Sequence, residues 1–446
     1  MKLISHPASR ALAGTMRVPG DKSIGHRALL FSLLSETPVR VRGMGDGADN
    51  GRSAKAISQL GATIAKAPSE PGAIVIRGVG LTGMRAPESA IDCGNSGTTI
   101  RLLCGLLAGQ KFTTTLVGDA SLSSRPMMRV IEPLRAMGAV IEGTPKGSDI
   151  TPPLTISGAA GLRAIDRTLE MASAQVKTAL VLAGLYADGD TRITEPGPSR
   201  DHSERMLAYL GAPIRTIGRT VSVDTRGWNR KLAGASFAVP GDPSSSAFLV
   251  AAAVIAGADE VRLPGVCVNP TRIGFLDAIA AMGGHVELED RDDSGPEPIA
   301  TLVIRGAARE LRGIEIAGDL AVRSIDELPV LAVVAARAKG TTTIRDASEL
   351  RVKESDRIAT TCAMLRAFGV DCEIRPDGFS VEGVPDRPLR AAHVHADADH
   401  RIAMAAAIAA LCADGPAEID DADNVATSYP GFATALTALG GNVVSA

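Results

Sequence analysis

The sequence is poor in aromatic residues and lacks the features that mark membrane, secreted or nucleic-acid-binding proteins. Only 3% of its 446 residues are aromatic, so we expect cores built from Ala, Val, Leu and Ile. The net charge of −3 gives no overall attraction for nucleic acid or acidic lipid. The longest uncharged apolar run, 247–258, is too short to span a bilayer, and no signal-like stretch follows Met1. We therefore expect a cytoplasmic protein with no membrane or nucleic-acid partner.

Cysteine is also scarce and carries no metal-binding spacing. None of the six cysteines forms a Cys-x-x-Cys motif, and most stand among apolar residues. We therefore expect buried thiols rather than disulfides or a zinc site. The cysteines are Cys93, Cys104, Cys267, Cys362, Cys372 and Cys412.

What the chain does contain is a repeat. Six helix-like stretches end in a bulky hydrophobe followed by glycine, and an apolar strand-like run comes next. Glycine adopts the left-handed conformation that commonly closes a helix, so each glycine is a predicted helix stop. One unit of strand, helix, strand, helix and strand is therefore predicted six times. The glycines are Gly61, Gly138, Gly211, Gly283, Gly369 and Gly440, at spacings of 77, 73, 72, 86 and 71 residues.

A coarser repeat divides the chain into two halves. Pro-Gly-Asp-Lys-Ser at 19–23 returns as Pro-Gly-Asp-Pro-Ser at 240–244, and Gly-Asp-Ala-Ser at 118–121 returns as Arg-Asp-Ala-Ser at 345–348. The separations of 221 and 227 residues predict two halves of three units, with a boundary near 228–241. The length suffices for two cores. A cleft between similar halves is a favoured place for a small-molecule site.

Polar segments at the predicted helix starts of the first half carry the candidate binding residues. In segment 18–27, Asp21 can cap a helix whose free N–H groups, with Lys22, Ser23 and Arg27, would form an anion site. In segment 94–101, glycines including Gly97 permit close backbone approach to a ligand. A solvated helix start explains each pattern about equally well.

Three further segments of the first half supply candidate ligand contacts. Arg125 can grip a carboxylate or phosphate with its planar guanidinium. The hydroxyl of Ser173 and the amide of Gln175 open a helix where they can reach a sugar-like ligand, and Arg200 is a candidate phosphate ligand. For each, an ordinary helix cap or a solvated charge is the alternative.

The second half has the densest group of titratable residues. Asp326 precedes an apolar helix and is either its cap or a base, with the cap favoured from the residues alone. Lys353 and Arg357 are predicted to share one helix face at i, i+4, with Glu354 beside them. A solvated, charged helix start explains this second pattern equally well.

A segment that alternates histidine and aspartate, 393–400, invites a metal-site interpretation. In an extended strand His393, His395, Asp397 and Asp399 would lie on one side, too far apart to close on one ion. We therefore expect no metal here. Asp399 is predicted to cap a helix and Arg401 to face an anion.

Taken in order, these segments resemble the signatures of the enolpyruvyl transferase family across nearly the whole chain. The resemblance is closest to the members that act on shikimate 3-phosphate. The matching segments are 18–23 with His26 and Arg27, 94–98, 118–122 with Arg125 and Pro126, 171–177, 325–327, 351–357 and 399–403.

The resemblance implies a fold and a reaction. The fold is a two-domain inside-out α/β barrel, each domain built from three βαβαββ units, with residues 16–236 in one domain, 1–15 and 237–446 in the other, and the active site in the cleft between them. The enolpyruvyl group of phosphoenolpyruvate would move to the 5-hydroxyl of shikimate 3-phosphate, releasing phosphate, in the shikimate pathway of aromatic amino acid biosynthesis. We expect a monomer that needs no cofactor or metal.

The resemblance also implies residue roles. Asp326 would take the hydroxyl proton and Glu354 would handle the methylene carbon of phosphoenolpyruvate with Lys22 nearby, although the two carboxylates can exchange these steps. Arg125, Arg357 and Arg401 would bind phosphoenolpyruvate, and Lys22 and Gln175 both substrates. The residues implied for shikimate 3-phosphate are Ser23, Arg27, Ser173, Ala174, Gln175, Arg200, Asp326 and Lys353.

Two positions bear on phosphoenolpyruvate and its mimic glyphosate. Gly97 stands where glyphosate-tolerant members have alanine, so we expect glyphosate to inhibit this protein. Enteric-type members carry a lysine in a Lys-Thr-Phe-Pro motif near the C-terminus. Here Thr427 and Ser428 precede Tyr429 and Pro430, so that contact is not carried over.

Two alternatives have a distinguishing sequence feature. The sister enzyme acting on UDP-N-acetylglucosamine typically has asparagine after the first lysine and a reactive cysteine before its arginine. Here Ser23 follows Lys22, and 120–125 contains no cysteine. A ring-forming DNA clamp also repeats α/β units six times, but its helices should be rich in Lys and Arg, whereas these are rich in Ala and Leu.

Overall fold

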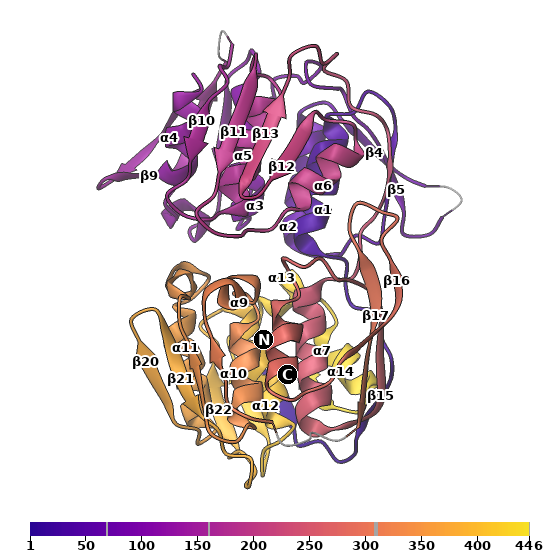
Figure 1. Ribbon diagram of the computed structural model, residues 1–446, viewed down its shortest axis with the longest axis vertical. Coiled ribbons are helices and arrows are strands. Elements are labelled where there is room, and N and C mark those ends of the chain that lie inside the picture. Colours follow the sequence, from indigo (N-terminus) through magenta and orange to yellow (C-terminus); the bar gives the residue numbers. More distant parts are fainter. Residues whose placement is uncertain (68–69, 159–160, 307–310, 446) are drawn as a thin grey trace. The chain divides into compact units, whose positions relative to one another are not determined.

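The computed structural model describes residues 1–67, 70–158, 161–306 and 311–445, which form two compact units (Figure 1). The N-terminal unit comprises Gly20–Val239 with the short segment Gly295–Glu297. The C-terminal unit comprises Met1–Pro19, Pro240–Ser294 and the chain from Pro298 onward.

The N-terminal unit contains three repeats of mixed helices and strands. In chain order its elements are α1 (Lys22–Leu33), β3 (Val39–Arg42), α2 (Ala48–Gln59), β4 (Thr63–Lys66), β5 (Ile74–Arg77), β6 (Ile91–Asp92), α3 (Gly97–Ala108), β7 (Thr114–Val117), the 3₁₀ helix η1 (Leu122–Ser124), α4 (Met128–Ala136), β8 (Val140–Lys146), β9 (Asp149–Ser157), β10 (Asp166–Thr168), α5 (Ala174–Gly184), β11 (Asp190–Thr194), α6 (His202–Tyr209), β12 (Ile214–Ile217), β13 (Thr220–Asp224) and β14 (Ser236–Ala238).

The C-terminal unit contains three more. Its elements are β1 (Leu3–His6), β2 (Leu12–Thr15), α7 (Pro243–Ala256), β15 (Ala258–Cys267), α8 (Gly274–Ala281), β16 (Glu287–Asp292), β17 (Ile299–Gly306), β18 (Glu315–Ile316), α9 (Gly318–Arg323), α10 (Leu328–Ala336), β19 (Thr341–Ile344), the 3₁₀ helix η2 (Ser348–Val352), α11 (Arg357–Ala367), β20 (Cys372–Arg375), β21 (Gly378–Glu382), β22 (Ala392–His395), α12 (His400–Ala410), β23 (Ala417–Asp420), α13 (Val425–Ser428), α14 (Phe432–Ala438) and β24 (Asn442–Ser445).

The six predicted helix stops are confirmed. Every one of the six glycines has a positive φ, between +76° and +116°. The residue before each glycine is the C-cap of α2, α4, α6, α8, α11 or α14. Each helix therefore ends where the sequence predicts, because glycine turns the chain back at no steric cost.

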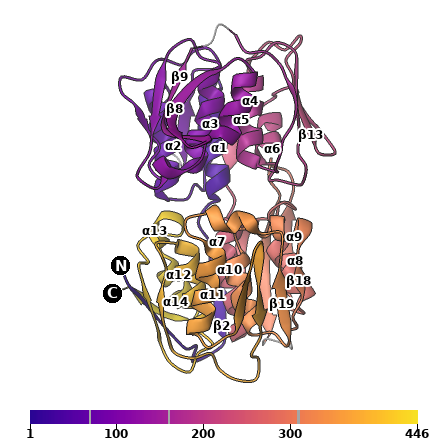
Figure 2. The same cartoon turned by 90° about the vertical axis from the view of Figure 1, so that its left-hand side faces the viewer.

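The six sheets share one topology. Each has four strands, in which a parallel pair is followed by two antiparallel neighbours, as in β6-β7-β9-β8. Three sheets take strands from distant parts of the chain, and in one of them β2 pairs with β15. β14 pairs with β3, and β1 lies between β23 and β24, so the first strand of the chain belongs to the last sheet. The two termini consequently lie side by side (Figure 2).

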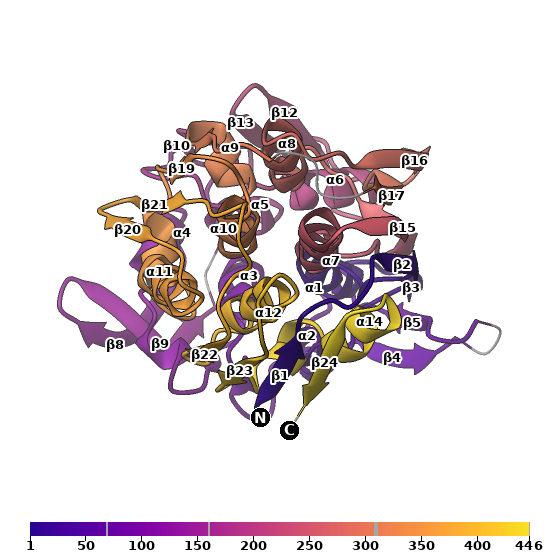
Figure 3. The same cartoon turned by 90° about the horizontal axis from the view of Figure 1, so that it is seen from below.

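The architecture of each unit is inside-out, as the resemblance implies. α7, α10 and α12 are apolar on all sides and almost entirely buried, which is typical of helices enclosed by other elements. In Figure 3 these three helices stand together inside the C-terminal unit, with its sheets around them. Within the described residues no helix is long and apolar enough to cross a membrane.

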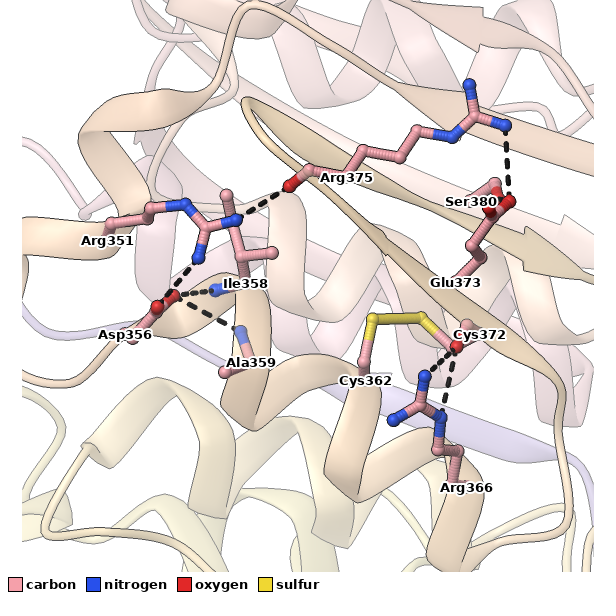
Figure 4. The surroundings of a disulfide bond; sticks show 10 residues. All are labelled: Arg351, Asp356, Ile358, Ala359, Cys362, Arg366, Cys372, Glu373, Arg375 and Ser380. Atoms are coloured by element: carbon pink, nitrogen blue, oxygen red, sulfur yellow. Dashed lines mark hydrogen bonds and ion pairs between the residues drawn. A yellow bond between two sulfur atoms is a disulfide. The ribbon is translucent and has the colours of Figure 1, made fainter.

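The expectation of buried thiols is wrong for two cysteines. Cys362 on α11 and Cys372 on β20 form a disulfide (Figure 4). The helix stop at Gly369 turns the chain back so that β20 packs against α11, and the two Cα atoms come within 5.2 Å. Cys93, Cys104 and Cys267 are buried thiols, and Cys412 is half-buried.

Candidate functional site

The start of α1 brings together cations and hydroxyls in the N-terminal unit. Asp21 caps the helix by accepting the N–H of Ile24 at 2.8 Å, as predicted. The Lys22 ammonium lies 3.2 Å from a carboxylate oxygen of Asp49. Arg27 is buried one turn further along, and its Nη1 donates to the carbonyl oxygen of Ser23 at 3.0 Å. Burial lowers the pKa of Arg27 to about 10, so it remains a cation at neutral pH.

Arg27 also joins α1 to two other helices. Its Nε donates to the Ser203 hydroxyl on α6 at 2.7 Å, and its Nη2 donates to Thr178 Oγ1 on α5 at 3.3 Å. Arg200, just before α6, donates to the Ser23 hydroxyl at 3.4 Å. Hydrogen bonds thus connect three predicted site residues, Ser23, Arg27 and Arg200.

A second group forms around the start of α3. Ser96 caps this helix by accepting the N–H of Thr99 at 3.1 Å. The guanidinium of Arg101 donates to Gln175 Oε1 at 2.8 Å, and the Gln175 amide donates to Thr98 Oγ1 at 3.1 Å. Arg101 was not predicted as a site residue, although it is the last residue of the candidate binding segment 94–101. Its hydrogen bond fixes the side chain of Gln175, which is a predicted site residue.

Gly97 makes room for two guanidinium groups. A Cβ atom at Gly97 would lie 2.8 Å from Arg101 Nη1 and 3.1 Å from Arg125 Nη1. Arg125 itself donates from Nη2 to Asn95 Oδ1 at 2.6 Å. Ser173 is the N-cap of α5 and Ala174 its first residue, one position before Gln175. Gly97, Arg125 and Gln175 therefore form a second group beside α3 and α5.

In the C-terminal unit all five predicted site residues meet around one buried arginine. Arg357 is 1% exposed, and Nη2 donates to Glu354 at 2.6 Å. Its Nη1 lies 3.4 Å from an Asp326 carboxylate oxygen. Lys353 Nζ approaches the same oxygen at 3.8 Å, and Arg401 Nη1 donates to the backbone carbonyl of Asp326 at 2.8 Å. These residues come from different elements, at the starts of α10, α11 and α12.

Asp399 holds the arginine from its buried side. Its carboxylate accepts from Arg357 Nε at 2.8 Å and from Nη2 at 3.2 Å. Burial alone would lower the pKa of Arg357, but Glu354, Asp399 and Asp326 outweigh it and the pKa is raised. For Asp399 the two effects have the opposite sign. Burial alone would raise the pKa of its carboxyl group, but the charge of Arg357 outweighs burial and the pKa is lowered. Both groups therefore stay charged at neutral pH.

Two expectations for this group are wrong. Lys353 and Arg357 do not share a helix face, because η2 ends at Val352 and α11 begins only at Arg357, after its N-cap Asp356. Asp326 does not cap a helix either. α10 begins at Leu328, and the preceding Glu327 makes no side-chain cap hydrogen bond. Asp326 is instead held by cations.

The alternating segment 393–400 does not stay extended. β22 ends at His395, and Asp397 has a φ of +50°, so the alternation breaks before it reaches Asp399. Asp399 caps α12 by accepting the N–H of Arg401 at 2.9 Å, which confirms that prediction. The described residues contain no group of three or more potential metal ligands.

Buried partners of the predicted residues were missed from the sequence. Asp399 was expected only as a cap, yet it also binds Arg357, which lies 42 positions away. Lys177, on α5, pairs with Glu195 and Glu204 at 2.7 Å each. A buried lysine inside an apolar helix is unusual, and this was the one available sequence signal.

Comparison with solved structures identifies the class of protein. The enolpyruvyl transferase NikO from Streptomyces tendae matches 99% of this chain and 98% of its own with a TM-score of 0.78, at 19% identity. The fold is therefore that of the enolpyruvyl transferases. EPSP synthase from Acinetobacter baumannii matches with a TM-score of 0.89 at 40% identity, covering 99% of each chain.

Sequence comparison then gives the particular family. The EPSP synthase (3-phosphoshikimate 1-carboxyvinyltransferase) family model matches residues 7–436. The 3-phosphoshikimate 1-carboxyvinyltransferase of Alkalilimnicola ehrlichii is 50% identical over 422 residues, covering 95% of this chain and 92% of that protein. That of Geobacter sulfurreducens is 48% identical over 436 residues, covering 98% of each. The chain belongs to the EPSP synthase family.

Proposed function

We propose that this protein transfers the enolpyruvyl group of phosphoenolpyruvate to the 5-hydroxyl of shikimate 3-phosphate, giving 5-enolpyruvylshikimate 3-phosphate and phosphate. The observation that carries this proposal is the match to 3-phosphoshikimate 1-carboxyvinyltransferases over nearly the full length of the chain. The reaction is a step of the shikimate pathway of aromatic amino acid biosynthesis.

The charge of the two substrates requires several cations from the chain. Two phosphates and two carboxylates carry roughly −5 to −6 together. Side-chain cations at helix starts can offset that charge where backbone N–H groups also point outward. The N-terminal unit offers Lys22, Arg27, Arg125 and Arg200, and the C-terminal unit offers Lys353, Arg357 and Arg401.

Shikimate 3-phosphate and phosphoenolpyruvate would divide these groups between them. Ser23, Arg27 and Arg200 are linked by hydrogen bonds, which suits a phosphate and its sugar-like ring. Phosphoenolpyruvate would bind Arg125, Arg357 and Arg401, with Lys22 and Gln175 between the substrates. The remaining contacts to shikimate 3-phosphate would come from Ser173, Ala174, Gln175, Asp326 and Lys353.

Asp326 and Glu354 would perform the proton transfers. Both contact Arg357, yet the Asp326 side chain is 14% exposed and Glu354 is 32% exposed. Lys353, Arg357 and Arg401 lie 3.4–3.9 Å from the Asp326 carboxylate and hold it in place, and Asp326 would act as the general base for the 5-hydroxyl. The more accessible Glu354, with Lys22, would protonate the methylene carbon of phosphoenolpyruvate.

A phosphate-release assay tests the reaction. We expect phosphate release with phosphoenolpyruvate and shikimate 3-phosphate, and none when UDP-N-acetylglucosamine replaces shikimate 3-phosphate. Asp326→Ala and Glu354→Gln should each lower kcat by about 100-fold or more, the usual contribution of a general acid or base. Near-normal turnover in both variants would refute the assigned roles, and turnover with the UDP-sugar would refute the assigned substrate.

Glyphosate should compete with phosphoenolpyruvate. In Gly97→Ala the new methyl group would displace the tips of Arg101 and Arg125, and weakening one charge-assisted hydrogen bond costs roughly tenfold or more in affinity. We therefore expect the inhibition constant for glyphosate to rise by about tenfold in this variant. Equal inhibition of the wild type and Gly97→Ala would count against Gly97 as part of this site.

A further inference from the structure

Lys177, Glu195 and Glu204 form a buried group of three charges in the N-terminal unit, and the group has no role in the proposed chemistry. Lys177 on α5 contacts Glu195 and Glu204, with an ammonium-to-carboxylate distance of 2.7 Å in each pair. The side chains are 4%, 5% and 7% exposed. Burial opposes the charge on Lys177, but the two carboxylates outweigh it and the pKa of the lysine is raised.

The two glutamates are used very differently. Glu204 contacts Lys177 through one oxygen, and its other oxygen is buried with no hydrogen-bond partner. Glu195 uses both oxygens on the binding loops. Its Oε1 accepts the backbone N–H of Ser173 at 3.0 Å, and its Oε2 accepts the Ser199 hydroxyl at 2.8 Å as well as contacting Lys177.

These contacts fasten together two loops that carry candidate substrate residues. Ser173 begins the turn that presents Ala174 and Gln175 at the start of α5. Ser199 directly precedes Arg200, whose guanidinium reaches the Ser23 hydroxyl. Simple neutralisation of Lys177 requires neither loop contact, because Glu204 already supplies a carboxylate without making one. The loop contacts of Glu195 therefore need a separate explanation.

We propose that Glu195 is a positioning residue for shikimate 3-phosphate, which fixes the Ser173 turn and the Ser199–Arg200 turn as one preformed binding surface. The proposal rests on the proposed function, because it assigns this surface to the shikimate substrate. Lys177 orients the Glu195 carboxylate from below, so that each oxygen faces one loop. Glu195 itself does not touch the substrate. Its effect should fall on the binding of shikimate 3-phosphate and not on that of phosphoenolpyruvate.

The test compares Glu195→Gln with Glu204→Gln. Each variant removes one carboxylate charge from Lys177, but only the first changes the loop contacts. We expect Glu195→Gln to raise the KM for shikimate 3-phosphate by about five- to tenfold, the size of one weakened hydrogen bond, and to leave the KM for phosphoenolpyruvate within about twofold. Glu204→Gln should change the KM for shikimate 3-phosphate less than Glu195→Gln does.

Calorimetric titration with shikimate 3-phosphate alone separates this inference from the reaction. If the wild type bound shikimate 3-phosphate in the titration but released no phosphate in the turnover assay, the proposed reaction would be wrong. The affinity of Glu195→Gln for shikimate 3-phosphate would still decide the role of Glu195. Equal increases in both KM values, an unchanged KM for shikimate 3-phosphate, or the same increase in both glutamine variants would overturn the inference.

A second variant keeps the inference testable if Glu195→Gln does not fold. Ser199→Ala removes one loop contact and leaves the Lys177 pair intact. It should raise the dissociation constant of shikimate 3-phosphate by about threefold or more. If both variants fold, their effects should be less than additive in the double variant, because both act through the same contact. No change in Ser199→Ala, or full additivity, would contradict the proposal.

Discussion

Removing the carboxylate of Asp399 should destabilise the C-terminal unit more than removing any exposed helix cap. Asp399 is fully buried, and its carboxylate makes several contacts at once, one of them with the Ser355 hydroxyl at 3.0 Å. It pairs with Arg357, which is 1% exposed, and it caps α12 through the N–H of Arg401. Asp399→Ala would leave a buried guanidinium without this partner, at a cost of about 3–5 kcal/mol, and would also lose a cap worth about 1 kcal/mol.

Two variants divide this cost into its parts. Asp399→Asn keeps an oxygen that can cap α12 but removes the charge, so we expect a loss of about 2–3 kcal/mol. Asp356→Ala is the matched control. Asp356 caps α11 through the N–H groups of Ile358 and Ala359, but its side chain is 39% exposed and its ion pair with Arg351 is at the surface. Its replacement should cost about 1 kcal/mol.

Urea denaturation followed by circular dichroism measures these differences as shifts of the transition midpoint at constant slope. Two compact units can unfold in separate steps, so the comparison concerns the transition that the variants move. A loss in Asp399→Ala no larger than that in Asp356→Ala would refute the reasoning, because it would mean that the buried pair contributes nothing beyond a cap.

The same pair predicts a pH dependence. Burial alone would raise the pKa of Asp399, but Arg357 outweighs it and the pKa is lowered. A carboxylate whose pKa is lowered in the folded state stabilises the fold fully when the pH is above its unfolded-state pKa, about 3.9. This stabilisation is lost as the pH falls through the folded-state pKa. The stability difference between wild type and Asp399→Asn should therefore shrink below about pH 4. A difference that grew with acidity would contradict the assigned ion pair.

Two simpler predictions concern the backbone and the thiols. Gly211→Ala should cost about 1 kcal/mol, because Gly211 has a φ of +82° and nothing within 4 Å of an added Cβ, so only backbone strain is measured. Gly51→Ala is the control, because Gly51 lies in equally open space inside α2 and has an ordinary φ. It should stabilise the fold by up to about 1 kcal/mol. Equal effects of the two substitutions on the thermal unfolding midpoint would disprove the strain argument. After denaturation without reductant, four thiols should react with Ellman's reagent, because two of the six cysteines, Cys362 and Cys372, are bonded to each other. A count of six would show that the disulfide does not form.

The predictable part of the fold is the part that local chemistry determines. A helix stop depends on one glycine and its neighbours, so all six could be located from the sequence. Strand order depends on where distant segments meet. The placement of β1 between β23 and β24 joins residues more than 400 positions apart, as in the pairing of Leu3 with Ile419. The repeat alone could not supply that pairing, and the family resemblance implied only that residues 1–15 belong to the C-terminal domain.

The same limit separates the predicted and missed parts of the candidate site. Asp21 and Asp399 were identified as caps because a cap needs only its own next three residues. The error over Lys353 and Arg357 came from extending one helix through 350–357. Asp356 was the neglected signal, because an aspartate that caps α11 places the helix start at the next residue. Glu354 is a local partner of Arg357, but its other two carboxylate partners, Asp326 and Asp399, lie 31 and 42 positions away and have no local signature.

The repeated Pro-Gly-Asp segments show how one local signal can serve two chemistries. Asp242 caps α7 by accepting the N–H of Ser244, as Asp21 caps α1. The repeat alone would therefore suggest two equivalent anion sites. In the second copy proline replaces the lysine, and the Ser244 hydroxyl donates to Glu327 while accepting from Arg272 at 3.1 Å. The cap fixes where each helix begins, but the residues after it determine whether that start offers cations to a ligand or holds a carboxylate inside the protein.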